Sequence, residues 1–174
     1  MQRMSSFDDV LAANETYAAA FIDHGLPGQA GKGLAVITCM DSRIDPLGML
    51  GLAKGDAKIM RNAGGRVTDD VLRTLVLAVH LLGVDRVLVV EHTECKMASA
   101  TDEQVHQGIY EASGLDTRSL DFALMDDQLM TLASDVQKVR SSPYLPKTVE
   151  VGGFLYDVRT GRLREVFSPA QDST

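Results

Sequence analysis

The chain opens with a stretch in which apolar side chains return at the spacing of an amphipathic helix. Residues 6–24 place these side chains on one face, and Ser6 and Asp9 have the spacing of a capping box at the start. Gly25 is the kind of residue at which helices end. We therefore predict a first helix over residues 6–24, whose apolar face needs a surface to pack against.

The next apolar segments alternate between strand-like and helix-like patterns. Residues 34–38 and 57–60 are short apolar runs, typical of buried strands. Residues 68–82 return apolar side chains at helical spacing behind Thr68, which can cap the helix. The β-branched run 87–90 follows directly. A strand, a helix and a strand in this order predict the crossover of a parallel sheet.

The last part of the chain predicts two more helices and a hairpin. Thr101 and Gln104 can form a capping box, and residues 129–139 return apolar side chains at helical spacing before Pro143. Residues 148–167 alternate apolar and polar side chains around a Thr-Gly pair, which indicates a hairpin at a sheet edge. The fold class is therefore α/β: a mainly parallel sheet flanked by helices, with a C-terminal edge hairpin.

Length and charge narrow the possible functions. The 174 residues, 45% of them hydrophobic, contain no repeat or linker, so we expect one domain over residues 1–174. The net charge of -7 includes no basic block, which argues against nucleic acid or an anionic membrane as the main partner. No leader-like start or membrane-spanning run stands out, so we expect a cytoplasmic protein.

The two cysteines and one histidine lie where predicted strands end. Cys39 follows the strand 34–38, and His92 and Cys95 follow the strand 87–90. The carboxyl ends of parallel strands face a common crevice, so adjacent strands would bring the three side chains together. Two thiolates and an imidazole suit one zinc ion and leave a fourth tetrahedral position open. The sequence therefore predicts a metal site that could be catalytic.

Asp41 and Arg43 lie close to this predicted site. Zn²⁺ with two thiolates is formally neutral, so a nearby group that orients water or accepts its proton would help catalysis. Asp41 is the candidate for that role, and the guanidinium of Arg43 can hold it ionised. The pair could also work as a gate, with Asp41 filling the fourth zinc position in a closed state.

Other interpretations of the same residues stay open at this stage. Cys39 and Cys95 could be buried apolar side chains or a thiol redox switch, although their separation is far from a Cys-X-X-Cys arrangement. A purely structural zinc would need a fourth protein ligand. The remaining histidines need no catalytic role; they are His24, His80 and His106.

Three segments of the chain together resemble the signature of the β-carbonic anhydrases. They are Cys39–Arg43, with the sequence CMDSR, Arg61–Gly64, with RNAG, and His92–Cys95, with HTEC. The closing stretch 152–157 is similar as well. The resemblance implies zinc-dependent, reversible hydration of carbon dioxide to bicarbonate and a proton by zinc-bound hydroxide. It implies one Zn²⁺ per chain on Cys39, His92 and Cys95.

The resemblance also implies roles for other residues and for a second subunit. Asp41 and Arg43 would form the dyad beside the zinc. The loop of Asn62, Ala63 and Gly64, which could be a simple turn, would line the substrate pocket with backbone donors. The family forms homodimers or higher even-numbered homo-oligomers, so the helix over 6–24 would pack on a partner subunit.

Two departures from the family pattern bear on the substrate. Lys96 follows Cys95 where many relatives have glycine, which can change the turn around the metal. The chain is also short and resembles the compact bacterial members. Such members are similar to enzymes that hydrolyse carbonyl sulfide or carbon disulfide, which makes these two linear molecules the alternative substrates.

Overall fold

Five strands form one sheet in the computed structural model, which describes residues 6–169. The strand order is β2-β1-β3-β4-β5. The first four strands pair in parallel, and the last pairs antiparallel with its neighbour at one edge. The strands are β1 (Leu34–Cys39), β2 (Ala57–Asn62), β3 (Arg86–His92), β4 (Glu150–Tyr156) and β5 (Leu163–Phe167). The predicted parallel sheet and its C-terminal edge hairpin are confirmed.

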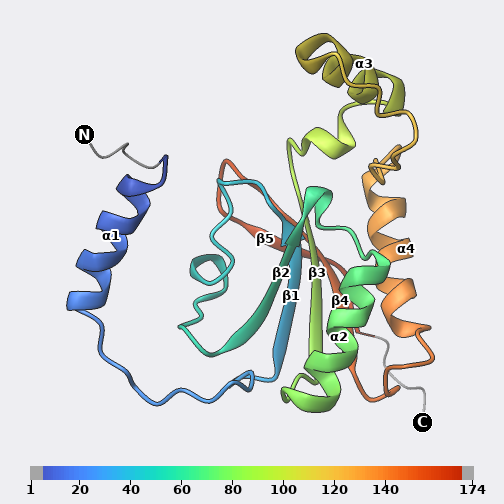
Figure 1. Cartoon of the computed structure of the whole chain (residues 1–174). Helices are drawn as coiled ribbons and strands as arrows, with labels where there is room; N and C mark the ends of the chain where they lie inside the picture. Colours follow the sequence, from blue (N-terminus) through green and yellow to red (C-terminus); the bar gives the residue numbers. More distant parts are fainter. Residues whose placement is uncertain (1–5, 170–174) are drawn as a thin grey trace, which may run out of the picture.

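Four α-helices accompany the sheet (Figure 1). Two of them lie against the sheet, one contacting β3 and β4 and the other β1, whereas α3 projects beyond the carboxyl ends of the strands. The helices are α1 (Asp8–Ala19), α2 (Asp69–Leu81), α3 (Asp102–Ser113) and α4 (Gln128–Arg140). Three short 3₁₀ helices are η1 (Gly48–Leu50), η2 (Ala63–Gly65) and η3 (Lys96–Ala98). None of the helices within residues 6–169 is long and apolar enough to cross a bilayer.

The apolar strand runs reflect burial on both faces of the sheet. All six residues of β1 are buried. Successive side chains of a strand point to opposite faces, so Ala35 and Ile37 join the core under α2 and α4. Leu34 and Val36 join a second core with Ile44. A continuous apolar run is therefore the pattern that this central strand requires.

Side-chain caps fix the starts of three helices. Thr68 accepts a hydrogen bond from the Val71 N–H (3.4 Å), which begins α2 as predicted. Thr101 and Gln104 form the predicted capping box of α3. The carboxylate of Asp127 accepts from the backbone N–H two positions into α4 and caps that helix. These caps satisfy backbone N–H groups that the first helical turn leaves without partners.

The first helix differs from its prediction. It covers Asp8–Ala19 rather than 6–24, and its N-cap residue is Phe7 with no side-chain cap, so the predicted box of Ser6 and Asp9 does not form. Gly25 lies instead in a separate turn closed by Asp23 (2.8 Å). No residue of α1 is buried, and the helix stands apart from the sheet (Figure 1). Without packing, only local preferences set its length, and these are weak.

A buried charged cluster joins α4 to the turn after β2. Asp135 of α4 has no exposed surface and accepts hydrogen bonds from Arg66 Nε (2.7 Å) and the Val67 N–H (3.0 Å). Glu91 of β3 is also fully buried. Burial, together with the negative charge of Asp135, raises the pKa of Glu91 to about 8. The direct ion pair of Arg66 is therefore with Asp135 and not with Glu91.

Removing this carboxylate should destabilise the fold strongly. We expect Asp135→Ala to lower the free energy of unfolding by about 3 kcal/mol, because it removes the carboxylate that pairs with a largely buried guanidinium and leaves the Val67 N–H without its acceptor. Asp70→Ala is the matched control, since it breaks an ion pair with Arg73 in which both side chains are at least 70% exposed. That change should cost under about 0.5 kcal/mol. Urea unfolding measures both, and similar small losses would contradict the prediction.

Candidate active site

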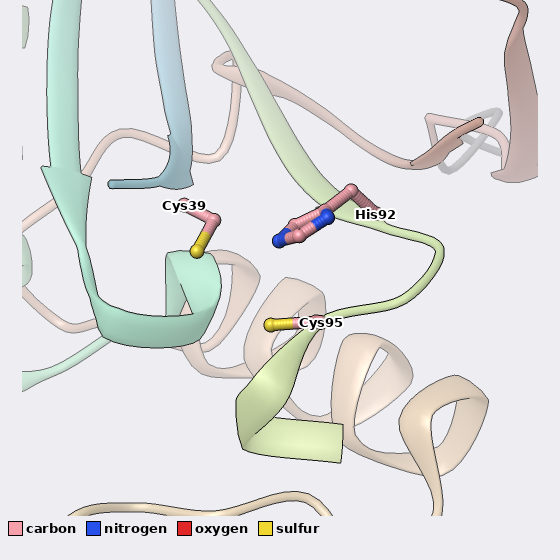
Figure 2. Close-up of side chains that lie close together, drawn as sticks. All are labelled: Cys39, His92 and Cys95. Carbon is pink, nitrogen blue, oxygen red and sulfur yellow. The ribbon is translucent and has the colours of Figure 1, made fainter. Parts of the chain in front are cut away.

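Adjacent strands bring three potential metal ligands together (Figure 2). Cys39 is the last residue of β1 and His92 the last of β3, while Cys95 immediately precedes η3. Their side chains point toward a common position (Figure 2), and all three are buried. One donor atom from each, two sulfurs and a ring nitrogen, lie within 4.8 Å of one another. The convergence follows from the parallel pairing of β1 with β3.

The geometry around His92 suits metal binding. A tetrahedral zinc site separates its sulfur and nitrogen ligands by roughly 3.5 to 3.8 Å, so only a small contraction of the three donors is needed. His92 Nδ1 donates a hydrogen bond to the Thr93 carbonyl (2.9 Å), which leaves the lone pair on Nε2. That Nε2 is buried and has no hydrogen-bond partner among the described residues. A buried acceptor without a partner is the expected state of a metal ligand.

The two thiols also fit a cation. The Gly64 N–H donates a hydrogen bond to Cys39 Sγ (3.3 Å), which fixes the position of that sulfur. Burial, and then the nearby Cys39, raises the pKa of Cys95 to about 11. Two neighbouring buried thiolates therefore need a positive charge between them, and a divalent zinc ion would supply it. Both cysteines are free thiols in the structure.

Asp41 and Arg43 form a closely bonded pair beside these donors. Arg43 donates to Asp41 through its backbone N–H (2.9 Å), Nε (3.0 Å) and Nη2 (2.7 Å). The guanidinium beside Asp41 holds the pKa of that carboxyl well below its usual range. Asp41 Oδ2 also lies 4.0 Å from His92 Nε2. An ionised carboxylate is thus placed next to the three donor atoms.

A second carboxylate contacts the pair, and sequence reasoning did not assign it a role. Arg43 Nη1 donates to Glu94 Oε2 (3.0 Å), and Arg159 Nε donates to the other oxygen of Glu94. Glu94 has a φ of 59°, uncommon for this residue type, in the turn between His92 and Cys95. The position of Glu94 inside the HTEC segment could have indicated a role at the site. Arg159 lies in the turn between β4 and β5, and nothing in the sequence indicated that it contacts Glu94.

The predicted pocket loop has a different environment from the three donors. The side chain of Asn62 accepts from the Arg66 N–H and donates to the Arg66 carbonyl, both at 2.8 Å, and so closes the loop. Asn62 and Ala63 line a cavity of about 510 Å³ that Cys39 does not border. Within this loop, Gly64 reaches the donor set through its N–H. The prediction that all three line the substrate pocket stays a prediction.

Two of the other histidines, His80 and His106, form hydrogen bonds away from the three donors. His80 Nε2 hydrogen-bonds the Tyr144 carbonyl (2.9 Å), and His106 Nδ1 hydrogen-bonds Thr117 Oγ1 (2.9 Å). Neither belongs to the group of potential metal ligands found among the described residues.

Comparisons with known proteins agree with this site. A family model described as carbonic anhydrase matches residues 34–121. The chain is 36% identical to beta-carbonic anhydrase 1 of Mycobacterium tuberculosis over 94% of its length and 99% of the relative's. It is 32% identical to a carbon disulfide hydrolase of Acidithiobacillus thiooxidans, covering 80% and 79%.

Solved structures give the same result. The carbonic anhydrase of Streptococcus mutans superposes with a TM-score of 0.86 at 38% identity, covering 95% of this chain and 99% of that one. The agreement extends over nearly the whole length of both proteins. The chain therefore belongs to the β-carbonic anhydrase family.

Proposed function

We propose that this chain catalyses the reversible hydration of carbon dioxide to bicarbonate and a proton, with one zinc ion on Cys39, His92 and Cys95. One observation carries the proposal: a buried Cys2His donor set has an ionised carboxylate, Asp41, beside it. Such a set leaves a fourth position for water, as catalytic zinc sites do. Because the thiolates must stay reduced, a reducing compartment such as the cytoplasm suits the enzyme.

The roles of the chain's own residues follow from the geometry. When bound, zinc supplies the Lewis acidity that makes a water molecule ionise near neutral pH. Asp41 accepts a hydrogen bond from that water and so orients it, and Arg43 fixes the carboxylate by two side-chain hydrogen bonds (3.0 and 2.7 Å). While both oxygens of Asp41 accept hydrogen bonds from Arg43, they are not free to bind the metal themselves. This arrangement leaves the fourth position to water, and Asp41 would fill it only in a closed state.

Hydrolysis of carbon disulfide or carbonyl sulfide is the second candidate. The observation in its favour is the 32% identity to a protein named carbon disulfide hydrolase. All three molecules are linear with an electrophilic carbon, so the same donor set and carboxylate serve each of them. Preference for one of these substrates over another would then depend on how each molecule reaches the three donors.

Stopped-flow hydration of carbon dioxide, with zinc measured in the same sample, tests the proposal. We expect about one zinc per chain and hydration that a chelator abolishes. Release of hydrogen sulfide from carbon disulfide and carbonyl sulfide is assayed on the same preparation. Zinc without hydration, but with sulfide release, would replace the first function by the second. A zinc-free active protein would contradict both.

We also propose that residues 1–174 form one domain that assembles into a homodimer or a higher even-numbered homo-oligomer. The support is α1 and the segment after it, where several large apolar side chains are 46–69% exposed: Val10, Leu11, Tyr17, Phe21 and Ile22. A 12-residue helix of this kind is marginal in water without a packing partner. A second copy of the chain would provide that surface.

Charges on the apolar face of α1 should therefore weaken assembly. We expect wild-type protein at twice the 18.8 kDa chain mass or a higher even multiple, and the double variant Leu11→Glu, Tyr17→Glu shifted toward the monomer. Thr16→Glu adds one negative charge on the opposite face of the helix and should leave the mass unchanged. Light scattering after size exclusion gives the masses. A monomeric wild type, or an unshifted double variant, would refute the role of α1.

A further inference from the structure

The pairing of Asp41 with Arg43 is a local motif that does not by itself need the active site. The same three bonds, from the backbone N–H, Nε and Nη2 of an arginine to an aspartate two residues earlier, recur at Asp116 and Arg118 on an exposed loop. Their N–H and Nε distances are 3.1 and 2.9 Å, against 2.9 and 3.0 Å at Arg43. An Asp-X-Arg turn is thus enough to form the pair. It does not determine where the pair points relative to the rest of the protein.

The two pairs differ in what holds the arginine from the other side. Arg43 Nη1 donates to Glu94 Oε2 (3.0 Å), and Nη2 also approaches the Glu94 carbonyl (3.5 Å). Within residues 6–169, the side chain of Arg118 has Asp116 as its sole acceptor. Glu94 therefore provides a cross-link between the loop after β1 and the turn after β3, which carries His92 and Cys95.

Glu94 is itself fixed by the turn between β4 and β5. Arg159 of that turn donates to Glu94 Oε1. Thr93, the residue before Glu94, is also bonded to this part of the chain. The Val158 N–H of the turn donates to Thr93 Oγ1 (3.2 Å), and the Thr93 N–H donates to the carbonyl of Tyr156 at the end of β4 (2.9 Å). Each of the two Glu94 carboxylate oxygens therefore accepts a hydrogen bond from a different arginine.

We propose that Glu94 is a positioning residue for the reaction proposed above: backed by Arg159, it fixes Arg43 and thereby sets the Asp41 carboxylate against the three metal ligands. The inference rests on that proposed function. Charge-assisted bonds to a guanidinium are directional, so losing one lets the Asp41–Arg43 unit turn on its loop while the pair itself survives. Small errors in the placement of a reacting group are costly in rate.

Kinetics of three variants and a control test this role. Glu94→Gln should lower kcat for carbon dioxide hydration about five- to tenfold, with KM and zinc content unchanged. Arg159→Gln should lower kcat less, by about two- to threefold, because it acts through Glu94. The double variant should be no slower than Glu94→Gln alone. Arg118→Gln, in the matching motif, should keep the wild-type rate.

A second readout does not depend on activity. In ¹⁵N-labelled, zinc-loaded protein, Glu94→Gln should shift the Arg43 side-chain signals and speed exchange of its guanidinium protons, leaving the Arg118 signals in place. Wild-type kcat in Glu94→Gln, additive losses in the double variant, or unchanged Arg43 signals would each overturn the positioning role. A zinc-loaded wild type that hydrates no carbon dioxide would overturn the proposed function instead, and the Arg43 signals would still decide whether Glu94 fixes Arg43.

Discussion

Replacing Cys39 by Ala should leave the purified protein with almost no zinc and no measurable hydration of carbon dioxide. The change leaves two protein ligands, His92 and Cys95, for an ion that holds three or four in nearly all protein sites. The lost thiolate is also the one that accepts the Gly64 N–H (3.3 Å). Metal analysis after dialysis should give under about a tenth of a zinc per chain, against about one for wild type.

Histidine variants provide the matched comparison for this result. His92→Ala should lose zinc as Cys39→Ala does, because its unpartnered Nε2 is the third donor. His80→Ala should keep zinc, since His80 hydrogen-bonds the Tyr144 carbonyl (2.9 Å) and is not part of the donor group found among the described residues. Full zinc in Cys39→Ala would show that the ligand set is wrong. It would also reopen the redox interpretation of the two cysteines, which a thiol titration with and without chelator would then test.

The parts of the fold that the sequence predicted are those set by local or strongly periodic signals. The caps at Thr68 and Thr101 have partners three residues away, so the pattern contains both members. The buried strand around Val36 is apolar except for Thr38, because both of its faces are covered by other parts of the chain. Cys39 and His92 are the last residues of their strands. Once the strands were predicted, their proximity required only that β1 and β3 be neighbours in the sheet.

The parts that escaped prediction depend on contacts between distant segments. The length of α1 could not be predicted from its apolar pattern, because none of its residues is buried within the described chain. The ion pair of Arg66 and Asp135 joins residues 69 positions apart, and that of Glu94 and Arg159 joins residues 65 apart. Charged residues at such separations carry no pairing signal in one sequence. Their partners become visible only once the strands are arranged.

Replacing Asp41 by Asn should abolish most of the activity while leaving zinc in place. We expect kcat to fall roughly 100-fold or more, because the amide matches the shape of the carboxylate but lacks its charge and has one acceptor oxygen in place of two. Asn can still accept the Arg43 N–H (2.9 Å), so the loop should keep its conformation. The donors Cys39, His92 and Cys95 are untouched. Zinc analysis and stopped-flow hydration on one preparation separate the two effects.

The repeated Asp-X-Arg turn supplies a control that tests chemistry against local structure. Asp116→Asn makes the same change in a loop with the same three hydrogen bonds, and in both turns the arginine holds the pKa of the aspartate well below its usual range. Asp116→Asn shows how far this change alone disturbs the structure of such a turn. Its carbon dioxide hydration rate should stay at the wild-type value, because this turn lies outside the donor group. A zinc-loaded Asp41→Asn protein at full rate would instead remove Asp41 from the mechanism. Because Asp41 differs from Asp116 chiefly in lying 4.0 Å from His92 Nε2, a large loss confined to Asp41→Asn assigns the effect to that position.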